Sequence, residues 1–279
     1  MSILFSLPVH ENNECIRDTI ANAKKYNPNC IFVIHVSANF HNFDISIGNI
    51  HNVFVNPIRF PTIHSQTSHV PLHLTNFKYA VDCGAIFDHV CILHTSEMFI
   101  KHETEDYIKN YDYSLWFDQN DQPRVNVWPP FQISYTHQIF KDLFDGGDPH
   151  NYVGNLIEGH WWKRELFEKM YKWTESHYNI MQMLWGYAAE EVYFATLGHH
   201  LSKTKNFSVP YNAFYHREHY LTSQDDVNDI RANKDVTIWQ NNNWVYNKIP
   251  IQSKNLYSIK RVNRELNDPI RKYINSLDP

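Results

Sequence analysis

Two short segments in the middle of the chain carry the residues best suited to chemistry. Residues 158–165 read EGHWWKRE and place a glycine and a histidine beside paired tryptophans. Residues 188–197 read AAEEVYFATL and place Glu190 and Glu191 at the start of an apolar helical stretch. An aromatic ring can stack on the apolar face of a sugar, and a carboxylate can take the proton of a sugar hydroxyl. The two segments together favour a site for sugar chemistry.

Each segment also has a purely structural interpretation. Carboxylates at a helix N-terminus are stabilised by the helix dipole, so Glu190 and Glu191 alone are typical of an ordinary helix start. Trp161 and Trp162 alone are more typical of a core than of a sugar platform. The chemical interpretation therefore depends on what else the chain offers.

Basic residues near the C-terminus offer a partner for phosphate. Many sugar-nucleotide transferases hold a divalent metal with an Asp-x-Asp motif after a central strand, and no such motif occurs here. After the strand expected at residues 89–93 the chain reads HTSEM, and the single carboxylate of Glu97 makes a poor metal site. Lysine and arginine can stabilise a departing diphosphate instead. The tail supplies such cations, which a solvated basic helix face would also explain: Lys260, Arg261, Arg264, Arg271 and Lys272.

Metal chemistry has weaker support. The 18 histidines show no HExxH or HxH spacing, and His216 and His219 are the nearest candidate pair. Asp118 and Asp121 are more typical of a turn than of a metal site. We therefore predict no metal site, and a metal-dependent hydrolase is the least favoured function.

Composition limits the number of domains and the functional classes that remain. A chain of 279 residues suits one large domain or two small ones. The net charge of −5 and the lack of a long basic block argue against a nucleic-acid surface. No apolar run reaches about 18 residues, and no secretory leader is evident, so we expect a cytoplasmic protein. Four cysteines without a CxxC pair indicate buried, reduced thiols.

The expected elements alternate through the first hundred residues. Buried strands are predicted at residues 3–9, 30–36, 52–55 and 89–93, and helices at 11–26 and 68–83. This alternation predicts an α/β fold with a Rossmann-like, mostly parallel central sheet flanked by helices. Ligands bind beyond the carboxyl ends of such strands, where His10 and Glu97 fall. Later helices are expected at 160–178 and 190–198, and the tail at 256–277 is expected to be partly helical.

Five segments in order resemble the family of core-2 and I-branching β-1,6-N-acetylglucosaminyltransferases and peptide O-xylosyltransferases. Residues 7–12 (LPVHEN), followed by a helix and strand, are similar to the opening of that family, and residues 87–100 to its central segment. Residues 159–162 (GHWW) resemble its Gly-Ser-x-Trp motif. Residues 189–197 resemble its Pro-Asp-Glu-x-x-Phe-x-Thr-Leu motif, and residues 256–261 its closing basic motif. The chain has Ala189-Glu190, Glu97 and His160 where the motifs have Pro-Asp, Asp and Ser.

The resemblance implies a GT-A-type fold in a single catalytic domain, residues 1–279. Residues 1–100 would bind the nucleotide sugar, and residues 101–279 would supply the acceptor side and a basic tail. It implies inverting transfer from a UDP-sugar without metal or other cofactor. The family's catalytic glutamate falls on Glu191, and its diphosphate-binding cations fall on or near Lys260 and Arg261.

The resulting expectation is a glycosyltransferase acting on an oligosaccharide or glycoprotein glycan. Arg264 would join Lys260 and Arg261 at the diphosphate, and the sugars would contact His10, Glu97, Glu158, Gly159, Trp161, Trp162 and Glu190. Crowding by Met98 and the tryptophans favours UDP-xylose over UDP-N-acetylglucosamine. Because animal members carry a membrane anchor and this chain resembles only the catalytic part, we expect a bacterial or viral enzyme. The alternative is an inactive module of the same fold that binds carbohydrate or nucleotide.

Overall fold

The structure is a computed structural model. It describes residues 1–62, 69–115, 138–143, 153, 157–183, 190–213, 221–234, 236–239, 248–251 and 253–278.

The first half of the chain builds a parallel sheet, as the alternating pattern predicts. Its elements are β1 (Ile3–Val9), α1 (Asn13–Tyr26), β2 (Ile31–Val36), the 3₁₀ turn η1 (Ile45–Asn49), β3 (Val53–Asn56), α2 (His69–Asp82) and β4 (His89–Ile92). β1 pairs in parallel with both β2 and β4, and β2 pairs in parallel with β3. The predicted α/β fold with a mostly parallel sheet is confirmed, and the predicted strands lie within one residue of the observed ones.

Later segments extend this sheet and add smaller ones. The main sheet has seven strands in the order β3-β2-β1-β4-β7-β6-β8. A second sheet has the order β5-β12-β9, and β10 pairs with β11. The added strands are β5 (Glu97–Phe99), β6 (Tyr113–Ser114), β7 (Trp161–Lys163), β8 (Phe207–Ser208), β9 (Asn212–Ala213), β10 (Val236–Trp239), β11 (Lys248–Ile251) and β12 (Ser258–Lys260). The other helical segments are α3 (Thr104–Ile108), α5 (Gln138–Leu143), α6 (Arg164–His177), η4 (Ile180–Gln182), α7 (Glu190–Leu201), α8 (Gln224–Arg231), η5 (Ser253–Asn255) and α9 (Pro269–Ser276).

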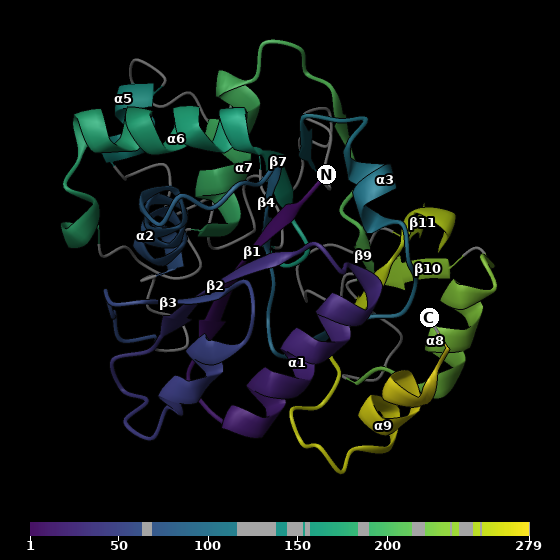
Figure 1. The fold of residues 1–279 in the computed structure, drawn as a ribbon. Coiled ribbons are helices and arrows are strands. Elements are labelled where there is room, and N and C mark those ends of the chain that lie inside the picture. The colour runs from purple at the N-terminus through teal and green to yellow at the C-terminus, as the bar shows by residue number, and fades with distance from the viewer. Residues whose placement is uncertain are drawn as a thin grey trace.

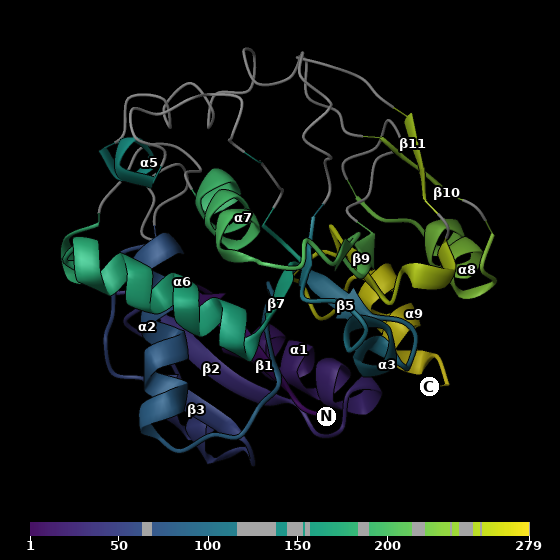
Figure 2. The same cartoon turned by 90° about the horizontal axis from the view of Figure 1, so that it is seen from above.

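Helices cover both faces of the main sheet. α1 lies on one face, and α2, α6 and α7 lie on the other (Figure 1, Figure 2). Successive strand residues point to opposite faces, so Phe5 and Phe32 pack under α1 while Leu4 and Val33 pack under α2. Two-sided burial explains why the strands are continuous apolar runs rather than alternating ones.

The C-terminal end of the chain returns to the first helix. α9 and α1 lie side by side in both views (Figure 1, Figure 2). Lys25 Nζ donates a hydrogen bond to the Leu277 carbonyl, 2.5 Å away. Asn275 Nδ2 donates to Asp18 Oδ1 at 2.6 Å. Residues some 250 positions apart in the sequence therefore share one surface.

The cysteines follow the prediction with one exception. Cys15, Cys30 and Cys91 are buried and all four thiols are free, but Cys83, just after α2, is exposed. None of the helices in the described ranges is both long enough and apolar enough to cross a membrane.

The packing of α7 generates a stability prediction at Gly198. Alanine in a helix is normally about 1 kcal/mol more favourable than glycine. Here a Cβ would lie 2.8 Å from Trp162 Nε1, so we expect Gly198→Ala to lower the free energy of unfolding by about 1–3 kcal/mol. In urea unfolding, Trp162→Phe should relieve part of this loss when the two substitutions are combined. A stabilised Gly198→Ala variant would contradict this account of the packing.

Candidate functional site

Three segments meet at one edge of the main sheet. β1 and β4 are parallel neighbours, so the residues that follow them, from His10 and from His94, lie on the same side. Residues 157–160 precede β7, which runs antiparallel to β4. The Gly159 amide donates to the Ile92 carbonyl at 3.1 Å. Glu158 therefore lies at the carboxyl edge of the parallel strands, where α/β proteins bind ligands.

The C-terminal segment brings its cations to this same edge. β12 pairs with β5 so that Lys260 lies opposite Glu97. Lys260 Nζ forms an ion pair with Glu158 Oε1. Farther on, Arg264 Nη1 lies 2.7 Å from Glu11 Oε1, and His10 Nε2 lies 3.3 Å from the same oxygen. The structure thus groups most of the predicted residues, although they come from opposite ends of the chain.

The Lys260–Glu158 pair is largely shielded from water. The side chains are only 7% and 15% exposed, respectively. Burial lowers the pKa of Lys260 well below its usual value, as do Arg261 and Arg264, while Glu97 opposes the shift. Glu97 is fully buried and accepts a hydrogen bond from Ser258 Oγ at 2.6 Å. Lys260 is therefore paired with Glu158 inside the protein, whereas Arg264 is paired with Glu11 and is partly exposed.

Histidines line the edge next to these cations. The His69 ring, at the start of α2, stacks on the His94 ring with centroids 6.4 Å apart. Among the described residues, His94 Nε2 is buried and has no hydrogen-bond partner. Burial lowers the pKa of His94, and Lys260 and His69 add to that effect. Burial and Arg264 lower the pKa of His10, although Glu11 opposes them. The lowered pKa values favour the neutral imidazoles, and an arriving anion would favour their protonation.

Sequence reasoning missed His69 and His94 as site residues. The position of His94 directly after the central strand was a usable signal, because strand ends face the ligand edge. No comparable signal marks His69, which reaches the site only because α2 begins there.

The N-terminus of α7, which carries Glu190 and Glu191, lies toward the same edge. Gly198 lies against Trp162, which pairs with Val90 inside β4. One turn earlier Phe194 packs on His73, whose ring bonds Ser6 in β1. The helix therefore runs antiparallel to β4. Its N-terminus lies one further turn toward the carboxyl ends of the parallel strands.

The pKa values of this glutamate pair are raised. Burial raises the pKa of Glu190 to about 7. Burial raises the pKa of Glu191 well above its usual value, and the negative charge of Glu190 adds to the effect. Desolvation therefore outweighs the helix dipole, which would stabilise the charged forms. A carboxyl group with a raised pKa can exchange a proton near neutral pH.

Both tryptophans belong to the core rather than to a sugar platform. Trp161 packs with His89 on the α1 face, and Trp162 packs with Phe167 and Phe194 on the other face. Both indole side chains are almost fully buried, so neither offers a ring face to a sugar. The expected stacking role is wrong because adjacent strand residues point to opposite, covered faces. Gly159 has a φ of +70°, which glycine adopts without strain at this turn.

Two other expectations from the sequence are corrected. Met98 is fully buried in a cluster with Leu256 and Ile259, so it does not crowd a sugar pocket. Arg271 is also fully buried and is no candidate to bind phosphate, whereas Lys272 is exposed. Asp118, Asp121, His216 and His219 lie outside the described residues. Within the described ranges, no three His, Cys, Asp or Glu side chains are arranged to hold a metal ion.

Comparison with solved structures finds that this chain is similar to several glycosyltransferases. No protein-family model and no curated sequence matches the chain. The galactosyltransferase LgtC in complex with donor and acceptor sugar analogues is 12% identical, with a TM-score of 0.41 over 100% of this chain and 98% of that one. A mannosyltransferase from Pyrobaculum calidifontis, in complex with GDP-Man and Mn2+, is 11% identical, with a TM-score of 0.41 over 75% of this chain. The chain spans about half the length of that mannosyltransferase, 54%.

The shielded ion pair generates a stability prediction. Removing one partner leaves the other charge buried, so Lys260→Met or Glu158→Gln should each cost about 3–5 kcal/mol of unfolding free energy. The double variant should cost clearly less than the sum of the two losses. Lys172→Met, which breaks the exposed Lys172–Glu168 pair, should cost only about 0.5 kcal/mol. Additive losses in urea unfolding would show that Lys260 and Glu158 do not interact.

Proposed function

We propose that this protein is a glycosyltransferase that moves a sugar from a UDP-sugar to a glycan hydroxyl by single displacement with inversion. One observation carries the proposal. Cations from the C-terminal segment lie at the carboxyl edge of a parallel sheet, and a glutamate pair with raised pKa values begins a helix directed to the same edge. This combination supplies a group for a leaving diphosphate and a base for an attacking hydroxyl.

The diphosphate would lie against the basic side chains. Arg264 is partly exposed, and a guanidinium can bind phosphate oxygens through two parallel hydrogen bonds. Arg261 and Lys260 add positive charge where the leaving group becomes more negative. The lowered pKa values of His94 and His10 favour neutral rings, and an arriving anion would favour their protonation. Together these groups would replace a metal ion, so no cofactor is needed.

Glu191 would act as the base. It would accept the proton of the acceptor hydroxyl as that oxygen forms a bond to the anomeric carbon. The bond from the anomeric carbon to the diphosphate oxygen would break on the opposite face, and UDP would leave with that electron pair. Glu190 keeps the proton affinity of Glu191 high by its negative charge, and it could also contact a sugar hydroxyl.

The structure narrows the set of sugar-contacting groups that the sequence predicts. Glu158 is the best candidate, since its Oε2 is buried and lacks a hydrogen-bond partner among the described residues. Glu97 is fully buried beneath the cations and would support β12 rather than touch a sugar. With Met98 and the tryptophans in the core, crowding no longer favours xylose. UDP-xylose and UDP-N-acetylglucosamine are the two donors that we propose for testing.

Removing the base should stop turnover without removing the donor. Glu191→Gln keeps the side-chain shape but cannot take a proton, so we expect release of UDP from either UDP-sugar to fall by at least about 100-fold. Calorimetric titration with UDP in EDTA should give nearly the wild-type affinity. Glu165→Gln, at the exposed start of α6, is the matched control and should keep full activity. An active Glu191→Gln variant would refute the assigned base, and a wild type that binds UDP without turnover would favour the inactive module.

The raised pKa of Glu191 sets the expected pH profile. A base works when ionised, so kcat/KM should fall as pH decreases through that pKa, well above the usual 4.5 of glutamate. Glu190→Gln removes the neighbouring charge and should move this acid limb to lower pH. The measurement is kcat/KM against pH for both proteins. An acid limb that stays in place in the Glu190→Gln variant would contradict the coupling.

A further inference from the structure

We propose that the buried Arg271 positions the anion-binding groups of the site. Its guanidinium comes from the first turn of α9 and is completely shielded from solvent, with 0% exposure. We define residues 261–264 as the cation loop. Arg271 would hold this loop against the turn after β4, and thereby set the distance between Arg264 and His94. The inference rests on the proposed function and gives Arg271 a positioning role, in which it acts through other residues.

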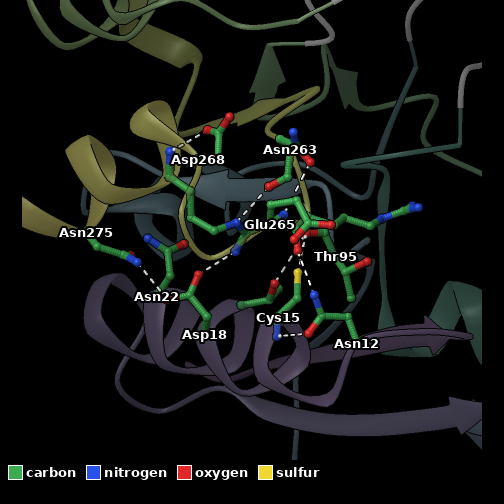
Figure 3. A network of polar contacts seen from close by, with 12 residues as sticks. Asn12, Cys15, Asp18, Asn22, Thr95, Asn263, Glu265, Asp268 and Asn275 are labelled. Atoms are coloured by element: carbon green, nitrogen blue, oxygen red, sulfur yellow. Dashed lines mark hydrogen bonds and ion pairs between the residues drawn. The ribbon is translucent and has the colours of Figure 1, made fainter.

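The guanidinium joins three segments that are distant in the sequence. Arg271 Nε donates to the Asn263 carbonyl at 2.8 Å, inside the cation loop. Arg271 Nη2 donates to the Thr95 carbonyl at 2.7 Å, in the turn after β4. Arg271 Nη1 forms an ion pair with Asp18 on α1. Figure 3 shows Asp18, Thr95 and Asn263 gathered around this point.

Only arginine suits this position. Its planar guanidinium has five donors with fixed directions, while lysine has one nitrogen and cannot reach three separate acceptors in this way. The partner carboxylate is itself fixed, because Asn275 donates to Asp18 Oδ1 at 2.6 Å. Asp268 accepts from the Ile270 and Arg271 amides at 2.9 and 3.0 Å, which fixes the start of α9.

Each backbone acceptor is one residue away from a group of the anion site. Thr95 follows His94, and Asn263 precedes Arg264. Other hydrogen bonds also hold the cation loop. The Val262 amide donates to the Ser96 carbonyl at 3.0 Å, the Thr222 amide donates to the Arg261 carbonyl at 3.2 Å, and Asn12 Nδ2 donates to the Arg264 carbonyl at 3.0 Å. Arg261 has a φ of +69°, a conformation that costs free energy in a non-glycine residue and needs support from its surroundings. Loss of the Arg271 contacts would free the Asn263 and Thr95 carbonyls, so we expect the part of the cation loop at residues 263–264 to shift although the other hydrogen bonds remain.

The test is UDP affinity at a temperature well below unfolding. Losing a hydrogen bond to a charged group typically weakens binding by about 10- to 100-fold, so we expect Arg271→Lys, which would displace Arg264, to raise the Kd for UDP by about this factor. Arg271→Ala should raise the Kd for UDP by a similar factor. Adding guanidinium at millimolar concentration should restore UDP binding to this variant, whereas adding methylammonium should not. Asp18→Asn keeps the arginine and removes only the charge of its partner, so it should raise the Kd for UDP by a smaller factor. This variant provides the test if the Arg271 variants fail to fold.

Asn22→Ala is the matched control for a general loss of stability. Asn22 is also buried and also joins α1 to the β5 region, through two hydrogen bonds to Phe99 of 2.7 and 3.0 Å. It does not contact the cation loop, so its variant should have a lower melting temperature but an unchanged Kd for UDP. Wild-type affinity for UDP in both the Arg271→Lys and Asp18→Asn variants would overturn this inference but not the proposed function. A wild-type protein that does not bind UDP would overturn the proposed function and this inference with it.

Discussion

The buried guanidinium of Arg271 is the interaction on which the geometry of the site depends. A charged group enclosed by protein is stable only when it is paired and hydrogen-bonded. Arg271 meets this requirement with one carboxylate and two backbone carbonyls, each from a different segment. The last helix, the first helix and the turn after the central strand must therefore be assembled together. The carboxyl edge of the sheet acquires its cations only when the C-terminal end of the chain is in place.

Opposite charges and shifted pKa values balance one another within the site. Lys260 is paired with Glu158, the pKa of His94 is lowered, and the pKa values of both glutamates on α7 are raised. Each arrangement reduces the cost of keeping ionisable groups away from water. An anionic donor would change this balance, because its negative charge favours protonated histidine. This arrangement fits a proposed site in which histidines add to the permanent positive charge of Arg261 and Arg264 when the donor arrives.

The sequence could predict the elements that depend on local patterns. Short β-branched runs such as residues 31–36 predict buried strands, and their alternation with helices predicts the parallel sheet. The start of α7 at Glu190 follows from its acidic first turn. The edge at which α/β proteins bind ligands also follows, because it depends only on strand direction. These features require no knowledge of distant contacts.

Features that depend on long-range packing could not be predicted in this way. Trp161 and Trp162 have the composition of a sugar platform, but the helices on both sheet faces enclose them. Arg271 has the sequence context of a solvated basic helix, and only its contacts with residues 18 and 95 reveal it as a buried group. Glu97 was expected at the sugar and instead lies beneath Lys260, since the pairing of β5 with β12 joins residues some 160 positions apart.

The central claim is that a nucleotide diphosphate binds at the carboxyl edge between the cation loop and the turn after β4. A crystal structure of the protein with UDP, grown in the presence of EDTA, tests it most directly. We predict diphosphate oxygens within hydrogen-bonding distance of the Arg264 guanidinium and next to the His94 ring, with Arg271 still bonded to residues 95 and 263. UDP bound at another surface, or a diphosphate that enters this edge only with a metal ion, would contradict the account.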